Sequence, residues 1–208
     1  GPYKRVLDLG CGDGSMSEQL HLLGLGEEFH LVDVSEAALR IAAARERQYV
    51  KSVMQADGAA LPFKNSAFNL TLVLKVLEHV PDLTAYLREV KRVSSQAVFE
   101  VPLATSIEHR ILNLGGRGEA RTTGHVNFFT LDSLLHTLEQ EGFLVQGLLF
   151  WPPQVLDWVH RGSPWKRAIY LLRVYLARVC FLILPPQIGA RIFTFNLMVH
   201  CRNDSEHP

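Results

Sequence analysis

The chain has 208 residues, of which 48% are hydrophobic and 20% are charged, and its formal net charge at neutral pH is zero. This is the composition of a globular protein that is long enough to bury a sizeable core, so we expect a single domain over residues 1–208 and no disorder. The balanced charge argues against a nucleic-acid-binding protein, which would carry a basic stripe on its surface.

Apolar runs of strand length alternate with helical patterns along the chain, which predicts βαβ units and a parallel sheet. Right-handed crossovers then place helices on both faces of that sheet. We therefore expect an α/β protein with a doubly wound, seven-stranded, mostly parallel sheet. The strands are expected near Arg5–Leu9, Phe29–Asp33, Val50–Ala56, Asn69–Lys75, Ala97–Val101, Leu144–Phe150 and Ile192–Cys201.

Three polar residues are placed to begin helices. Ser15 is expected to cap the first helix, because Glu18 follows it at the spacing of a capping box. Ser35 and Asp82 are expected to cap the next two helices.

The first strand ends in a glycine-rich turn, Asp8-Leu9-Gly10-Cys11-Gly12-Asp13-Gly14. Glycine has no Cβ and adopts positive φ angles at little cost, so such a turn lets the backbone approach a ligand closely. Asp8, at the carboxyl end of the strand, would repel a phosphate but can accept hydrogen bonds from an ammonium group. The turn therefore predicts a nucleoside ligand that carries positive charge.

This turn resembles the first motif of class I S-adenosylmethionine-dependent methyltransferases, whose cofactor is a sulfonium nucleoside with an amino-acid tail. The chain is similar to the small-molecule members, such as the ubiquinone/menaquinone-biosynthesis group. Further matches follow in the order of that family: Leu31-Val32-Asp33-Val34-Ser35, Gln55–Phe63, Phe68-Asn69-Leu70, Val76–Asp82 and Gly124–Thr130. The resemblance implies a Rossmann-like fold and S-adenosyl-L-methionine as the cofactor.

Two departures from the family pattern are visible. Asn69 stands where the relatives usually carry an aspartate, which removes a charge but leaves the strand apolar. The relatives also have helical sequence before the first strand that helps to cover the cofactor. Gly1 and Pro2 are expected to be the remnant of a protease cleavage site, in which case part of that cover is missing from this sequence.

The resemblance also implies roles for individual residues. Asp33 is expected to bind the ribose hydroxyls, and Asp57 is expected to accept a hydrogen bond from the adenine amino group. The expected cofactor-binding residues are Asp8, Gly10, Cys11, Gly12, Gly14, Asp33, Val34, Asp57, Gly58 and Lys75.

His79 and His125 are the candidate catalytic residues. If the acceptor is a hydroxyl group, either imidazole could remove its proton near neutral pH. His79 could equally cap a helix or bond to the backbone, and the same holds for His125. The other histidines are scattered without metal-ligand spacing, so no metal site is expected.

The cysteines indicate a cellular compartment but no disulfide or metal site. Cys11, Cys180 and Cys201 are odd in number and far apart, so they predict neither a disulfide framework nor a metal cluster. We therefore expect a reducing compartment, the cytoplasm.

Two segments are expected to shape the acceptor side. The glycine-rich stretch 102–124 follows the fifth strand and is expected to form a mobile lid. Residues 151–190 are expected to form an apolar helical insertion or cap, in which residues 168–184 read as a helix with Lys166, Arg167, Arg173 and Arg178 on one arc. This helix is expected to cover an acceptor pocket or a dimer face, or to lie peripherally on a membrane with Trp151, Trp158 and Trp165 before it. It is too short for a membrane span.

These patterns predict an enzyme that transfers a methyl group from S-adenosylmethionine to a small or lipid-like acceptor by in-line displacement. Two alternatives stay open. The glycine turn could serve a nicotinamide-dependent dehydrogenase, or the chain could be a catalytically silent methyltransferase-like module that binds cofactor or a membrane for a partner. The sequence does not determine the acceptor, the atom that is methylated or the oligomeric state.

Overall fold

The computed structural model describes residues 2–103, 124–151 and 196–203, together with isolated positions between 172 and 185. The strands are β1 (Tyr3–Leu9), β2 (Gly26–Asp33), β3 (Val50–Gln55), β4 (Leu70–Leu74), β5 (Gln96–Pro102), β6 (Phe143–Trp151) and β7 (Asn196–Asn203). The helices are α1 (Ser15–Leu22), α2 (Glu36–Ala44), α3 (Leu83–Val93) and α6 (Leu131–Gln140), with a 3₁₀ turn, η1 (Leu77–His79), after β4.

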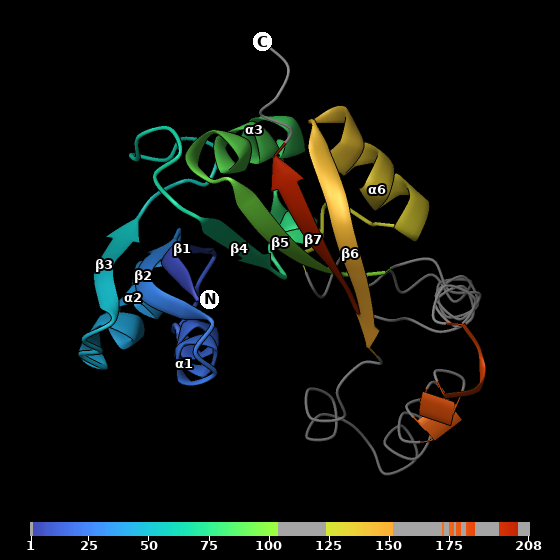
Figure 1. Cartoon of the computed structure of the whole chain (residues 1–208), viewed down its shortest axis with the longest axis horizontal. Helices are drawn as coiled ribbons and strands as arrows, with labels where there is room; N and C mark the ends of the chain where they lie inside the picture. Colours follow the sequence, from blue (N-terminus) through green and yellow to red (C-terminus); the bar gives the residue numbers. More distant parts are fainter. Residues whose placement is uncertain are drawn as a thin grey trace.

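These strands form one sheet in the order β3-β2-β1-β4-β5-β7-β6 (Figure 1). The first five strands pair in parallel, and β7 runs antiparallel to both β5 and β6. The expected doubly wound, mostly parallel sheet is therefore confirmed, and so are the seven strands, although residues 192–195 of the last one lie outside the described residues. The order in which successive strands are added to the sheet reverses between β1 and β4, and open α/β sheets bind ligands at such a point.

Helices cover the two faces of the sheet separately. In β1, Val6 packs into a cluster with residues of α2, whereas Leu7 packs into the cluster that includes α3 and α6. Successive side chains of a strand point to opposite faces, so a strand that is buried on both sides is apolar throughout. Figure 1 shows α3 and α6 on one side of the sheet and α1 and α2 on the other.

Two of the three expected helix caps are confirmed. The Ser35 side chain accepts a hydrogen bond from the Ala38 amide, and the Asp82 side chain accepts one from the Ala85 amide. The prediction for Ser15 is wrong, because α1 is preceded by Gly14, whose φ of 71° is left-handed, and no side chain caps it.

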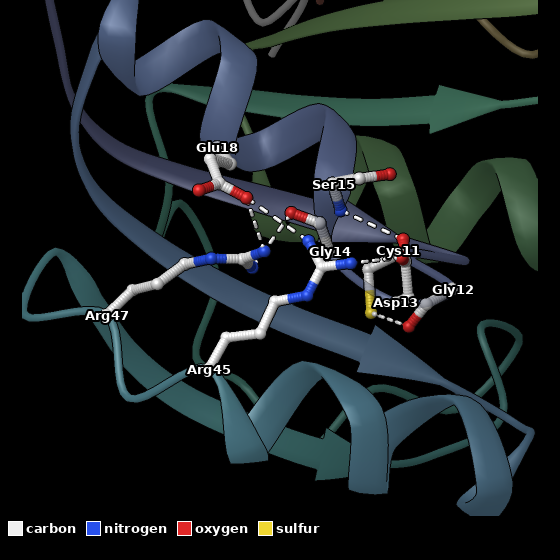
Figure 2. A network of polar contacts seen from close by, with 8 residues as sticks. All are labelled: Cys11, Gly12, Asp13, Gly14, Ser15, Glu18, Arg45 and Arg47. Atoms are coloured by element: carbon white, nitrogen blue, oxygen red, sulfur yellow. Dashed lines mark hydrogen bonds and ion pairs between the residues drawn. The ribbon is translucent and has the colours of Figure 1, made fainter.

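The other half of the expected capping box has a different role. Glu18 accepts hydrogen bonds from Arg45 and Arg47 at 3.1 and 2.7 Å, and these contacts tie α1 to the segment that follows α2 (Figure 2). Only glycine adopts the left-handed conformation at little cost in free energy. Gly14 does so directly before α1, and Ser15 is therefore the first residue of the helix instead of its cap.

Two expected features fall on parts of the chain that are not described. The glycine-rich lid over residues 104–123 and most of the cationic helix and its surrounding insertion lie outside the described residues. Among the residues that are described, no helix combines the length and the hydropathy that a membrane span requires.

Candidate cofactor-binding site

Two cavities lie where the chain leaves the carboxyl ends of the parallel strands. The first, of about 460 Å³, has Asp33, Asp57 and His79 in its wall. The second, of about 360 Å³, has Asp8 and Glu100 in its wall. Gly10 and Lys75 belong to both walls, so the two cavities adjoin at the turn after β1.

A third hollow, of about 230 Å³, shares Met16, Leu74 and Met198 with the wall of the second cavity. Its wall consists mainly of aliphatic and aromatic side chains. It therefore lacks the acidic acceptors that a positively charged nucleoside requires.

The glycine turn is held tightly against its neighbours. Gly10 has a φ of 81°, and a Cβ at this position would lie 2.3 Å from Cγ2 of Val76, so only glycine fits. The amides of Gly10 and Cys11 both donate to the Val32 carbonyl, at 2.7 and 3.1 Å. These contacts fix the turn to β2, and Gly10 lines both cavities.

Gly14 differs from the other expected cofactor-binding glycines, because it lines neither cavity. Its carbonyl accepts a hydrogen bond of 2.9 Å from Nη1 of Arg47 (Figure 2). A Cβ at Gly14 would lie 2.8 Å from that nitrogen. The structure therefore places Gly14 in the packing between α1 and the segment after α2.

Asp8 is the buried acid of the site. Its side chain is 2% exposed, and the Ser17 hydroxyl donates a hydrogen bond to its Oδ2 at 2.5 Å. Burial raises the pKa of Asp8 to about 6, the Ser17 hydrogen bond opposes this, and the charge of Asp33 adds to it. A cation in the second cavity would stabilise the carboxylate and lower this pKa again.

Asp33 stands at the end of β2, between the turn and the first cavity. Its Oδ2 accepts from the Gly12 amide and its Oδ1 accepts from the Ser35 amide, each at 2.8 Å. Each oxygen of a carboxylate can accept two hydrogen bonds. Asp33 therefore has acceptor capacity for two hydroxyl groups in the cavity that it lines.

Asp57 and Gly58 follow β3 on the other side of the same cavity. Oδ1 of Asp57 accepts a hydrogen bond of 2.9 Å from the Ala59 amide, which fixes the side chain. A Cβ at Gly58 would lie 2.1 Å from the ring of Tyr86, so the glycine allows that ring to pack against the loop. Val34, Asp57 and Gly58, which the sequence predicts to bind the cofactor, thus line one cavity.

Lys75 directly follows β4 and is in the left-handed conformation, with a φ of 58°. Its amide donates to the Glu100 carbonyl at 2.9 Å, and its ammonium lies 3.9 Å from Oε1 of Glu100. This conformation turns the chain from β4 into η1 between the two cavities. Cys11 also lines the second cavity, but burial raises the pKa of its thiol, so it is present as the neutral group.

The two candidate catalytic histidines come together although they are far apart in the sequence. His79 in η1 lines the first cavity, and its Nδ1 lies 3.2 Å from the Gly124 carbonyl. The ring of His125 packs edge-on against the ring of His79, with 4.9 Å between their centroids. His125 itself does not line either cavity.

Comparison with known proteins identifies the family. A family model described as a methyltransferase domain matches residues 2–147, which is more than half of the chain. The chain is a class I S-adenosylmethionine-dependent methyltransferase domain.

Two curated methyltransferases illustrate the relationship. The domain is 29% identical over 162 residues to a Mycobacterium tuberculosis protein named "Probable S-adenosylmethionine-dependent methyltransferase", which covers 76% of this chain and 57% of that one. It is 34% identical over 97 residues to the ubiquinone/menaquinone biosynthesis C-methyltransferase UbiE of Shewanella oneidensis, which covers 44% of this chain and 39% of that one. The chain thus spans about half the length of the curated relatives that it matches.

Solved structures agree on the fold. The YcgJ protein of Bacillus subtilis superposes with a TM-score of 0.65 at 20% identity, covering 97% of this chain and 93% of that one. Geranyl diphosphate C-methyltransferase from Streptomyces coelicolor superposes with a TM-score of 0.63 at 15% identity, covering 98% and 74% of the two chains.

Two residues that line these cavities were missed by sequence reasoning. Glu100 is buried in β5 and lines the second cavity, where burial raises its pKa. An acid within an otherwise apolar strand was a signal that could have indicated it. Tyr86 lines the first cavity, and its buried hydroxyl has no hydrogen-bond partner among the described residues. It lies on the buried face of an amphipathic helix, which carried no sign of a site.

Proposed function

We propose that this methyltransferase domain binds S-adenosylmethionine across the two adjoining cavities and transfers its methyl group to a small or lipid-like acceptor. The observation that carries the proposal is the distribution of acids along the cavities. Asp33 and Asp57 line the first cavity, and the buried Asp8 lines the second, on the far side of the turn at Gly10. This arrangement suits a ligand with sugar hydroxyls and an exocyclic amine at one end and an ammonium at the other.

The residues present fit this cofactor in charge. Gly10 lines both cavities, and a side chain at this position would collide with Val76. Asp33 would bind the ribose and Asp57 the adenine amine, while Asp8 would attract the ammonium of the amino-acid tail. The cofactor supplies a methyl group on a cationic sulfur, which is an electrophile that needs no covalent help from the protein.

The contribution of the protein is then to align the acceptor with the methyl group and to exclude water. The wall of the second cavity combines Glu100 with the apolar side chains of Met16, Trp151 and Met198. Such a wall favours an acceptor with apolar surface. If a hydroxyl acceptor reaches into the first cavity, His79 in its wall would take the proton from it.

Relatives support this class of acceptor. Their names assign them to ubiquinone and menaquinone biosynthesis, as a C-methyltransferase and as an O-methyltransferase, or to geranyl diphosphate. These compounds are quinoid or isoprenoid in nature. By analogy we expect a small molecule with an apolar part, and no nucleic acid.

Titration calorimetry with S-adenosylhomocysteine and with NAD⁺ tests the cofactor assignment. We expect the first to bind and the second not to bind, and tighter binding of NAD⁺ would favour a dehydrogenase. Transfer of labelled methyl from S-adenosylmethionine into a metabolite extract tests the activity. Cofactor binding without transfer to any extracted compound would instead support a catalytically silent binding module.

A further inference from the structure

Three side chains with metal-binding atoms meet beside the first cavity. Glu78, His79 and His125 each place one such atom within 4.8 Å of the other two. The first two residues belong to η1, and the third lies in the segment that leads into α6. The cluster therefore joins two parts of the chain that are distant in sequence.

The carboxylate of this cluster is buried without a full set of partners. Glu78 is 3% exposed, and its Oε2 has no hydrogen-bond partner in the described part of the chain. Burying a charged oxygen without a partner is costly, so buried carboxylates are normally paired, hydrogen-bonded or bound to a metal. Because this carboxylate lies within 4.8 Å of a ring nitrogen of His79 and of His125, a cation bound by all three side chains would supply the missing partner.

One ring nitrogen of His79 is engaged by the backbone. Its Nδ1 faces the Gly124 carbonyl at 3.2 Å, and a carbonyl oxygen can only accept a hydrogen bond, so Nδ1 is the donor. Nε2 is the ring nitrogen that is left to bind a metal ion. Metal-binding histidines commonly donate their second ring N–H to a backbone carbonyl in this way.

Backbone contacts fix the two segments to each other. The Glu78 carbonyl accepts hydrogen bonds from the Val126 and Asn127 amides at 2.8 and 3.0 Å. The Asn127 side chain donates to the carbonyls of Leu77 and Val80 at 2.9 and 2.6 Å. These hydrogen bonds hold the segment that contains His125 against η1, and so bring the three side chains of the cluster together.

We propose that Glu78, His79 and His125 form a binding site for a divalent transition-metal ion of the zinc class. Two imidazoles and one carboxylate are a ligand set for Zn²⁺ or Fe²⁺, rather than for Mg²⁺ or Ca²⁺, which prefer oxygen ligands. Tetrahedral binding at about 2.1 Å places ligand atoms about 3.4 Å apart, so ligand atoms that lie within 4.8 Å of one another must close in by up to about 1.4 Å. His79 is exposed and can make this movement.

Three protein ligands leave a fourth position open. The metal would lower the pKa of a water molecule or an acceptor hydroxyl at that position. Activation of an acceptor in this way rests on the proposed function, whereas metal binding by the three side chains does not. Coordination uses the same Nε2 lone pair that a general base needs. In the metal-loaded protein, His79 is therefore a ligand instead of a base.

A competition assay for Zn²⁺ between the protein and a chromophoric chelator tests the site. The protein is metal-free and carries no affinity tag. We expect the wild-type chain to bind one equivalent, and we expect Glu78→Gln, His79→Ala and His125→Ala each to weaken binding at least tenfold. The matched control is His136→Ala, which removes an exposed histidine of α6 and should bind as the wild type does. Zn²⁺ should also raise the melting temperature of the wild type and of the control, but not that of the three variants.

The proposal is overturned if the wild type binds no Zn²⁺ in excess of the three variants, or if His136→Ala weakens binding as much as they do. Melting curves of the metal-free variants show whether they fold, and His79→Ala, at an exposed position, decides the matter if Glu78→Gln does not fold. Calorimetry with S-adenosylhomocysteine in the absence of metal reports on the proposed function separately.

Discussion

Cofactor affinity is expected to fall as the pH is lowered from 7 to 5, because Asp8 loses the charge that attracts the ammonium of the cofactor. Burial raises the pKa of Asp8 to about 6. The carboxylate is then about 90% ionised at pH 7 and about 10% ionised at pH 5, so the affinity for S-adenosylhomocysteine should fall about tenfold, or about 1.4 kcal/mol.

Titration calorimetry at pH 5, 6 and 7 measures this slope. Asp8→Asn should bind weakly and with no slope in this range. Asp13→Asn is the matched control on the same turn: hydrogen bonds from Ser15 lower the pKa of Asp13, so it stays ionised throughout and the slope should persist. A wild-type dissociation constant that changes less than twofold between pH 5 and 7 would refute the reasoning.

The raised pKa of Asp8 also predicts how the stability of the cofactor-free protein depends on pH. The folded state holds the Asp8 proton more tightly than the unfolded state, so the contribution to stability is full below pH 3.8 and is lost as the pH rises through about 6. The shift corresponds to about 3 kcal/mol. Asp8→Asn should therefore be more stable than the wild type at pH 7, by up to this amount, and equal to it at pH 3.5. Urea unfolding at the two pH values measures the difference, and a less stable variant at pH 7 contradicts it.

Asp33→Ala should weaken the binding of S-adenosylhomocysteine about tenfold to a hundredfold by calorimetry, because a charged acceptor of the ribose is lost. Asp57→Asn should weaken binding less than Asp57→Ala does. Wild-type affinity in the variants of either aspartate would remove that residue from the site. Gly10→Ala should lower the free energy of unfolding in urea by about 1–3 kcal/mol, since its Cβ would lie 2.3 Å from a valine methyl group. Gly24 has a similar φ of 70° but open space around it, so Gly24→Ala should lose only the stability that a left-handed alanine costs. Equal losses in the two variants would contradict the clash. If the basic residues within 166–178 lie on a membrane, each should add about 1 kcal/mol of attraction to anionic vesicles, which salt weakens; co-sedimentation that is equal with neutral vesicles, or absent, speaks against membrane contact.

Much of the architecture follows from local patterns in the sequence. The alternation of apolar runs with helical periods predicts all seven strands, because side-chain period and turn chemistry act over a few residues. The caps at Ser35 and Asp82 are of the same local kind. The exception is Ser15, where a left-handed glycine moves the start of the helix by one residue.

The order of the strands and the contacts between distant segments were decided by the tertiary structure. Lys75 comes to lie beside Gly10 because β4 pairs with β1, and nothing local to either segment specifies that pairing. Glu78 and His79 meet His125 only when the segment before α6 docks on η1 through backbone hydrogen bonds. Strand order and such docking depend on which surfaces bury one another across the whole chain, and burial raises the pKa of Asp8 for the same reason.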